Sequence, residues 1–226
     1  MAKKRITRKE LLKKPDEFLT FSSKIIEFIS AHPRQLKYLV VGVTIIIVAY
    51  ISGYFYLDHI NEKAQEAYNK AYYTLTEVET RKVTPDTLRK SGELFKNVID
   101  KYGMSKIARL AISQVAYVRF QNKKFDEAIA LYKKFIEKVS GDSRYESLAN
   151  MALATCYEAK GDFQAAIERS KAILEIPDNP FRETALLNLA RLFRLDNNPE
   201  KAEEFLREFV QECQNSPFLP LVKSHL

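Results

Sequence analysis

Residues 148–180, LANMALATCYEAKGDFQAAIERSKAILEIPDNP, hold the pattern that decides the fold of this chain. They predict two antiparallel helices that meet at a tight turn around Gly161, since glycine readily adopts the left-handed conformation that ends a helix. Ala154 in the first helix and Ala166 in the second are small enough to let the two helices approach closely. The prolines at the end of the stretch stop the second helix. The stretch therefore predicts one helix pair.

The same arrangement occurs upstream and downstream of this stretch. The second-helix alanines of the three units are Ala128, Ala166 and Ala202, which lie 38 and 36 residues apart. In the downstream unit Asn197 or Asn198 can take the place of the turn glycine, because asparagine tolerates the left-handed conformation. Repetition at this period indicates that the units stack, each covering the apolar face of its neighbour.

The types and spacing of these residues resemble the tetratricopeptide pattern, whose unit is about 34 residues long. The resemblance implies an all-α fold, a right-handed solenoid of about four helix pairs over residues 58–215, with residues 216–226 as a cap or tail. The first pair is degenerate, with helices expected at about 58–80 and 85–102. The low content of 6 Gly and 8 Pro likewise argues against an all-β protein with many tight turns.

A long apolar segment precedes the repeats. Residues 36–57 read LKYLVVGVTIIIVAYISGYFYL, and the last 20 of them carry no charge. Twenty residues at about 1.5 Å each match a hydrocarbon core of about 30 Å. We predict a transmembrane helix that stays attached, because the apolar run is too long for a signal peptide and ends in bulky residues. The alternative is a buried core helix.

The net charge of +7 lies mostly before this segment. Residues 1–37 carry ten Lys/Arg and four Asp/Glu, a balance of +6. The repeats therefore have no basic excess, which argues against nucleic acid as a partner. The positive-inside rule predicts a cytoplasmic N-terminus and residues 58–226 across the membrane. In a Gram-negative bacterium that arrangement anchors the chain in the inner membrane with its repeats in the periplasm.

Residues 1–35 are expected to form a basic cytoplasmic stub that contains an amphipathic helix. Phe and Ile residues recur there at steps of three and four between Pro15 and Pro33. Such a helix either lies on the membrane lipid or docks on a membrane partner. Within the span, Gly42 and Gly53 share one face with Ala49, which permits an oligomer through the transmembrane helix.

The first helix of each pair is expected to line the concave side of the solenoid. Such a surface would be an apolar trough with arginines at one end, which suits an extended or helical peptide. The alternative is that several of its residues pack against a C-terminal cap. The predicted protein-binding residues are Leu110, Ser113, Tyr117, Phe120, Leu148, Met151, Thr155, Leu187, Arg191 and Arg194.

Some tetratricopeptide domains hold the C-terminal carboxylate of chaperones with a fixed set of Lys and Asn residues on the concave face. The positions of this chain that match that set are Ser113, Tyr117 and Ala152. None of these side chains can replace a lysine or an asparagine in the clamp. A chaperone receptor of that kind is therefore not expected.

No pattern in the sequence indicates catalysis. The three histidines, His32, His59 and His225, are far apart in the chain, and no His/Cys group has the spacing of a metal site. Cys156 falls beside the small core position of its repeat and is expected to be a buried thiol, and Cys213 ends a helix. No phosphate-binding loop or nucleophile motif occurs. We predict no catalytic residue, no cofactor and no metal, and hence no enzyme.

The layout of a short basic N-terminus, one span and a four-unit solenoid resembles the YfgM-type bacterial membrane proteins over roughly residues 36–215. That resemblance implies association with the SecYEG translocon and with the membrane-anchored periplasmic chaperone PpiD. A membrane-anchored scaffold, chaperone-like or ancillary to the Sec translocon, is therefore expected. The alternative is a structural subunit of a secretion, motility or division assembly that docks one folded partner. The longer stub departs from the family.

Overall fold

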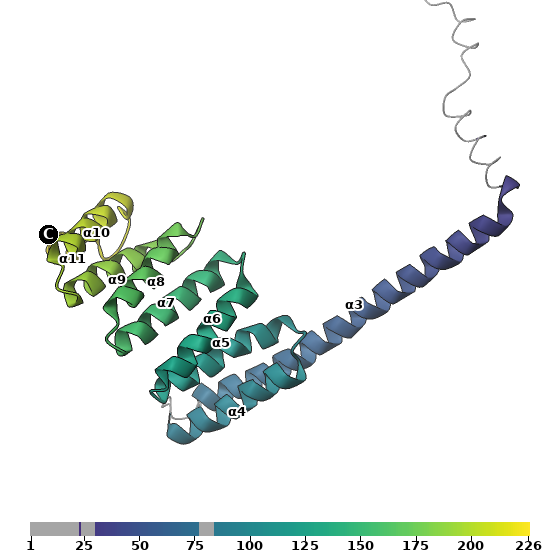
Figure 1. Ribbon diagram of the computed structural model, residues 1–226, viewed down its shortest axis with the longest axis horizontal. Helices are drawn as coiled ribbons and strands as arrows, with labels where there is room; N and C mark the ends of the chain where they lie inside the picture. The colour runs from purple at the N-terminus through teal and green to yellow at the C-terminus, as the bar shows by residue number, and fades with distance from the viewer. Residues whose placement is uncertain (1–22, 24–29, 77–83) are drawn as a thin grey trace, which may run out of the picture. The chain divides into compact units, whose positions relative to one another are not determined.

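The computed structural model describes residue 23, residues 30–76 and residues 84–226 (Figure 1). All regular elements in these ranges are helices, as predicted. The amphipathic helix expected in the stub falls largely outside the described residues. The helices are α3 (Pro33–Thr76), α4 (Pro85–Lys101), α5 (Lys106–Gln121), α6 (Phe125–Val139), α7 (Ser143–Ala159), α8 (Phe163–Glu175), α9 (Arg182–Leu195), α10 (Pro199–Glu212) and α11 (Leu219–Lys223).

The chain divides into two compact units, Met1–Tyr56 and Leu57–Leu226. The first unit contains the most apolar part of α3, whose side chains are exposed throughout. α3 is 44 residues long, so it is both long and apolar enough to cross a membrane. The described residues leave the large apolar side chains of this segment exposed. The alternative interpretation, a core helix, would require them to be buried.

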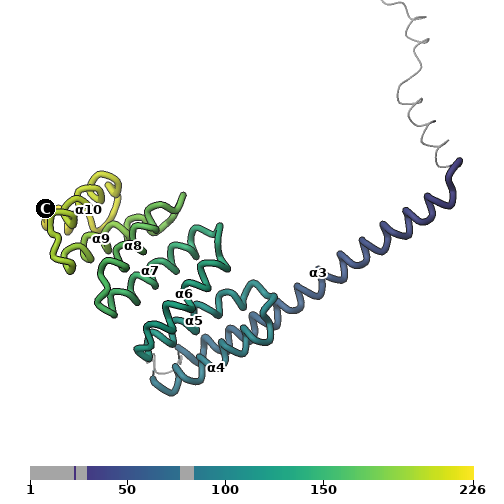
Figure 2. The backbone as a smooth tube through the Cα atoms, in the orientation of Figure 1, coloured from purple at the N-terminus to yellow at the C-terminus, as the bar shows by residue number. Residues whose placement is uncertain are grey.

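The second unit is a stack of helix pairs. The pairs are the distal part of α3 with α4, then α5 with α6, α7 with α8, and α9 with α10 (Figure 2). From α4 onward each helix packs on the one that follows it in the chain. This is the solenoid of about four pairs that the repeat period predicts, and the short α11 follows the last pair.

The turn inside each of the last three pairs has the same backbone. Lys123, Gly161 and Asn197 have positive φ angles of 61°, 78° and 56°. Each turn is a Schellman motif, which satisfies the last carbonyls of the first helix. In each motif the residue after the turn donates its N–H to the carbonyl five positions earlier: Lys124 to Arg119 (2.9 Å), Asp162 to Tyr157 (3.0 Å) and Asn198 to Phe193 (2.8 Å). The sequence predicted Gly161 at its turn and either Asn197 or Asn198 at the last one, and the structure has Asn197 there.

Small residues form the contact between the two helices of each pair, as predicted. The second-helix alanines are fully buried, and the first-helix alanines are at most 7% exposed. A larger side chain at these positions would push the helices apart. Ala116 and Ala128 lie in one core cluster and Ala154 and Ala166 in another, which also includes Ala202, while Ala190 is buried in the cluster at the C-terminal end.

The end of the solenoid is closed by side chains of the last repeat and α11. Val222 is buried against Leu186 and Phe209. Arg182, at the start of α9, donates to the carboxylates of Glu208 (3.0 Å) and Glu212 (2.5 Å) on α10. Its guanidinium also donates to the backbone carbonyl of the last turn of α8. These contacts tie three helices together and fix the C-terminal end of the stack.

Candidate protein-binding site

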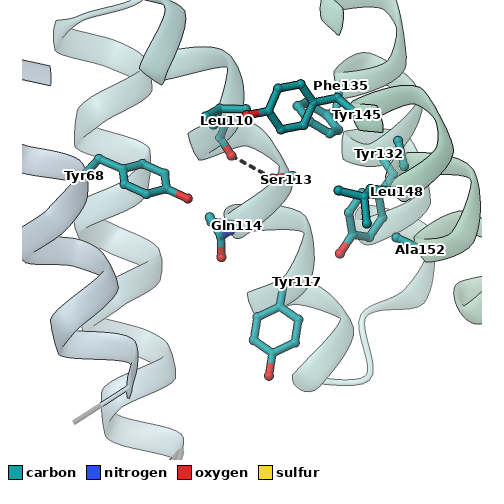
Figure 3. A pocket seen from close by; sticks show the side chains of 11 residues that line it. Tyr68, Leu110, Ser113, Gln114, Tyr117, Tyr132, Phe135, Tyr145, Leu148 and Ala152 are labelled. Carbon is teal, nitrogen blue, oxygen red and sulfur yellow. Dashed lines mark hydrogen bonds between the residues drawn. The ribbon is translucent and has the colours of Figure 1, made fainter. Parts of the chain in front are cut away.

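A cavity of about 380 Å³ lies within the second unit, between α3, α5, α6 and α7 (Figure 3). We call it the tyrosine pocket. Its volume is in the range of known ligand sites. Aromatic rings form much of its wall, and no charged side chain lines it. The lining residues are Tyr68, Leu110, Ser113, Gln114, Tyr117, Tyr132, Phe135, Tyr145, Leu148, Ala149 and Ala152.

Helical spacing places four α5 side chains on one wall of the pocket. Leu110, Ser113, Gln114 and Tyr117 follow one another at steps of three, one and three, so they share a helix face. The Ser113 hydroxyl donates to the carbonyl of Leu110 over 2.8 Å (Figure 3). That bond uses its proton within the helix. The other polar groups of this wall are the Tyr117 hydroxyl and the Gln114 amide, which interacts with Tyr68.

Two contacts hold Tyr68 in position on the α3 wall. Its ring packs edge-on against Phe95 of α4, with the centroids 5.2 Å apart. About two turns earlier on α3, Asn61 accepts the N–H of Lys106 over 2.9 Å, which fixes the start of α5 against α3. Figure 3 shows the Tyr68 hydroxyl directed toward α5, near Gln114. The α3 and α5 walls are therefore joined by a short-range network.

The floor and the far wall come from α6 and α7. Tyr132 is only 7% exposed, and Phe135 packs edge-on against Tyr145 with centroids 6.2 Å apart. Leu148, one turn after Tyr145, is 43% exposed at the rim. An exposed leucine beside buried aromatic rings is the arrangement of an apolar anchor site, because an incoming side chain covers both.

Burial keeps the phenols of Tyr132 and Tyr68 neutral. It raises the pKa of Tyr132 far above its usual value, and it also raises the pKa of Tyr68, where a hydrogen bond with Gln114 acts in the opposite direction. Neutral phenols donate one hydrogen bond each and repel no carbonyl oxygen. The pocket therefore offers apolar surface with a few hydrogen-bond donors, which suits a peptide segment.

Four of the ten residues predicted to bind protein, Leu110, Ser113, Tyr117 and Leu148, line the tyrosine pocket. Two other predicted residues, Met151 and Phe120, do not line the pocket. Met151 is partly buried on α7, one helical step from Leu148. Phe120 lies at the end of α5, where its ring packs on Phe125 across the turn with centroids 5.5 Å apart.

Thr155 is exposed on α7, and its hydroxyl donates to the carbonyl of Met151 over 3.0 Å. The last three predicted residues lie at the C-terminal end and have partners within the chain. Leu187 packs against the apolar cluster that includes Val222 of α11. Arg191 binds the carboxylate of Glu158 through two nitrogens, and Arg194 contacts the carbonyl of His225 at 3.5 Å. Leu187 and Arg194 therefore have the contacts that the alternative interpretation expects, since both pack against the C-terminal end of the chain.

Sequence reasoning missed the pocket residues of α3 and α6. Tyr68 comes from the degenerate first pair, and Tyr132 belongs to a second helix, which was not expected to reach the concave side. Helical periodicity could have predicted one further pocket residue, Tyr145. It shares a face of α7 with Leu148 and Ala152, because the three follow one another at steps of three and four residues. The remaining pocket residues become neighbours only through packing.

The described residues contain no group of His, Cys, Asp and Glu suited to a metal ion. Cys156 and Cys213 are both free thiols. Cys156 is 1% exposed, and burial raises its pKa to about 11. A thiol in that state is a core residue, in agreement with its position in the repeat.

Comparisons with known proteins agree on one architecture. A family model described as "Tetratricopeptide repeat-like domain" matches residues 34–175, and a model described as "Tetratricopeptide repeat" matches residues 184–216. No curated protein matches the chain. Several solved structures are similar to it at 16–17% identity, a level at which the likeness shows the fold alone.

One similar structure is a tetratricopeptide repeat protein from Parabacteroides merdae, with 17% identity, a TM-score of 0.56, and coverage of 72% of this chain and 58% of that one. Another contains the nearly identical TPR-like repeats of a putative kinesin light chain from Podosopora anserina (17% identity, TM-score 0.54, coverage 71% and 82%). A third is BtubC from P. vanneervenii (16% identity, TM-score 0.50, coverage 84% and 85%).

Proposed function

Because the chain belongs to the tetratricopeptide repeat-like domain family, we propose that it is a membrane-anchored scaffold whose tyrosine pocket binds a segment of a partner protein. Folds of this family are generally non-catalytic and generally bind proteins. The observation that carries the proposal is the pocket itself: an uncharged, preformed cavity walled by aromatic rings, in a chain where 29% of the residues are charged. Exposed Leu148 at its rim adds apolar surface for a partner to cover.

The anchor in this proposal is the transmembrane helix of residues 36–57. It is supported by the exposed apolar part of α3 and by the basic excess of residues 1–37. The N-terminus is then cytoplasmic, and the repeat domain of residues 58–215 lies in the periplasm of a bacterium. A Cβ atom added at Gly42 or Gly53 meets nothing within 4 Å, which leaves room for a second span to pair with this one.

The partner we favour follows from the resemblance to YfgM-type proteins. The scaffold would collect proteins at the periplasmic face of the inner membrane, either as a chaperone-like subunit or as an ancillary component of the Sec translocon. The second candidate is a structural subunit that docks one folded partner. One observation favours that candidate: Arg191 and Arg194 already have partners within the chain, which leaves the tyrosine pocket as the part of the predicted trough that suits one defined segment.

Photocrosslinking in living cells separates these proposals. A photoreactive amino acid replaces Tyr117, and a matched control places it at Glu168, an exposed residue of α8 outside the pocket. The adducts are identified by mass spectrometry. Translocon subunits or many envelope proteins bound only from position 117 support the chaperone-like role, and one dominant adduct supports the structural subunit. Equal adducts from both positions, or none, would overturn binding at the pocket.

A further inference from the structure

A second groove of different character adjoins the tyrosine pocket. That groove, with a volume of about 490 Å³, lies where the start of α5 meets the loop between α6 and α7. Leu110 and Tyr145 line both cavities, so the two form one continuous surface. Lys106 and Arg109 also line the groove. We call this second cavity the basic groove.

The two cations of the basic groove have no acidic partner in the part of the chain that the structure describes. Neither side chain lies within 4.0 Å of a carboxylate there. The Arg109 guanidinium donates one hydrogen bond, to the carbonyl of Lys138 at the end of α6 (3.2 Å), which holds it at the groove and leaves its other donors available. Lys106 is exposed at the first turn of α5. By contrast, Arg182 and Arg191, which lie between helices, are each paired with Glu.

One acidic residue also lines the groove, and its charge is partly used. The Asp142 carboxylate caps α7, where it accepts the N–H groups of Arg144 (3.2 Å) and Tyr145 (3.3 Å). The Glu146 carboxylate, which accepts the N–H of the groove residue Gly141 over 2.8 Å, is likewise held by the loop backbone. Among the side chains that line the groove, the two cations outnumber the one carboxylate. The groove is thus complementary to a negative charge, whereas the tyrosine pocket beside it is complementary to an apolar side chain.

We propose that the partner segment of this scaffold is an extended acidic peptide: an apolar side chain fills the tyrosine pocket, and an Asp or Glu close to it in the same segment lies in the basic groove against Lys106 and Arg109. This inference rests on the proposed function and specifies its partner. Both cavities are open grooves joined side by side, so the chain passes through them and the carboxylate comes from a side chain. This arrangement differs from a clamp for a chain terminus, whose residues are absent here.

Peptide selection tests this directly. The full chain, in nanodiscs of phosphatidylcholine, selects binders from a library of random twelve-residue peptides displayed on phage. We expect enriched peptides with Leu, Phe, Tyr or another bulky apolar residue and with Asp or Glu within a few positions of it. For a synthetic copy of the best peptide, the double variant Lys106→Gln/Arg109→Gln should bind about five- to tenfold more weakly, since two partly exposed ion pairs are lost.

Controls distinguish this inference from the proposed function. Lys133→Gln removes an exposed charge of α6 outside both cavities and should leave the affinity unchanged. Leu148→Arg should abolish selection of both features. Apolar peptides without acidic enrichment, or with equal affinity for the double variant, would overturn the acidic partner and leave the pocket as a binding site. If no peptide is enriched against wild type, both proposals fail.

Discussion

Arg191 of α9 and Glu158 of α7 form a two-point ion pair, with Nη1 2.5 Å from Oε1 and Nη2 2.7 Å from Oε2. The residues are 33 positions apart and lie on the first helices of successive pairs. The pair therefore links one repeat to the next, and it occupies the arginine that the sequence assigned to partner binding.

This ion pair predicts a pH-dependent contribution to stability. The Arg191 hydrogen bond holds the pKa of Glu158 below its usual value of 4.5, so the stabilisation is present above that value and is lost as the pH falls through the lower, folded pKa. Because both side chains are partly exposed, Arg191→Ala should lower the free energy of unfolding by only about 0.5–1 kcal/mol at neutral pH. Denaturant titrations followed by circular dichroism should show this difference at about pH 7 and not at about pH 3. An equal difference at both pH values would contradict the assignment.

The turn between α5 and α6 is the weakest of the three equivalent turns. Lys123 adopts a left-handed conformation that glycine adopts without strain, and Lys124 provides no side-chain cap for α6. Lys123→Gly should therefore raise the free energy of unfolding by up to about 1 kcal/mol. Gly161→Ala, with φ at 78°, is the reciprocal control and should lower it by about the same amount. A shift of the same sign in both variants would show that turn strain is not the cause.

The alanine contacts predict a sharp dependence on side-chain size. Ala166 is fully buried between α7 and α8, so Ala166→Leu should destabilise the repeat domain by about 1–3 kcal/mol through overpacking. Ala159→Leu, at an exposed position of α7, supplies the same added volume and should change stability by less than about 0.5 kcal/mol. Thermal denaturation compares the two variants, and similar losses in both would refute close helix packing at Ala166.

The two cysteines should differ in reactivity. Cys156 is buried with its pKa raised to about 11, whereas Cys213 is partly exposed. Alkylation depends on thiolate and access, so iodoacetamide at about pH 8 should modify Cys213 first and Cys156 only after unfolding. Peptide mass spectrometry of a time course measures both rates. Early modification of Cys156 in the folded chain would mean that its repeat opens readily.

The helix pairs could be predicted because their determinants are local. The alanine contacts, Gly161 and Asn197 follow a fixed spacing that the sequence displays directly. The left-handed Lys123 was not expected, because nothing about lysine favours that conformation. It is imposed by the two helices that the turn must connect.

The candidate site was harder to predict from the sequence. Periodicity shows which residues share a helix face, but it does not show which residues of other helices pack on that face. Phe120 shares a face with Tyr117 but lies at the helix end, where Phe125 of the next helix packs on it. Arg191 was predicted to bind a partner, yet Glu158 of another repeat pairs with it. Tyr68 joins the pocket from α3 only because Phe95 and Asn61 fix α3 against its neighbours.

The central claim is that the tyrosine pocket is where this scaffold holds its partner. The most direct measurement compares the yield of partner adducts from a photoreactive residue at position 117 in two further variants. Leu148→Arg places a charge at the pocket rim, and Leu195→Arg places the same charge at an equally exposed leucine of α9 (43% and 44%). With folding of both variants verified by circular dichroism, the account predicts that Leu148→Arg abolishes the adducts and that Leu195→Arg preserves them. Adducts that persist in Leu148→Arg would contradict it.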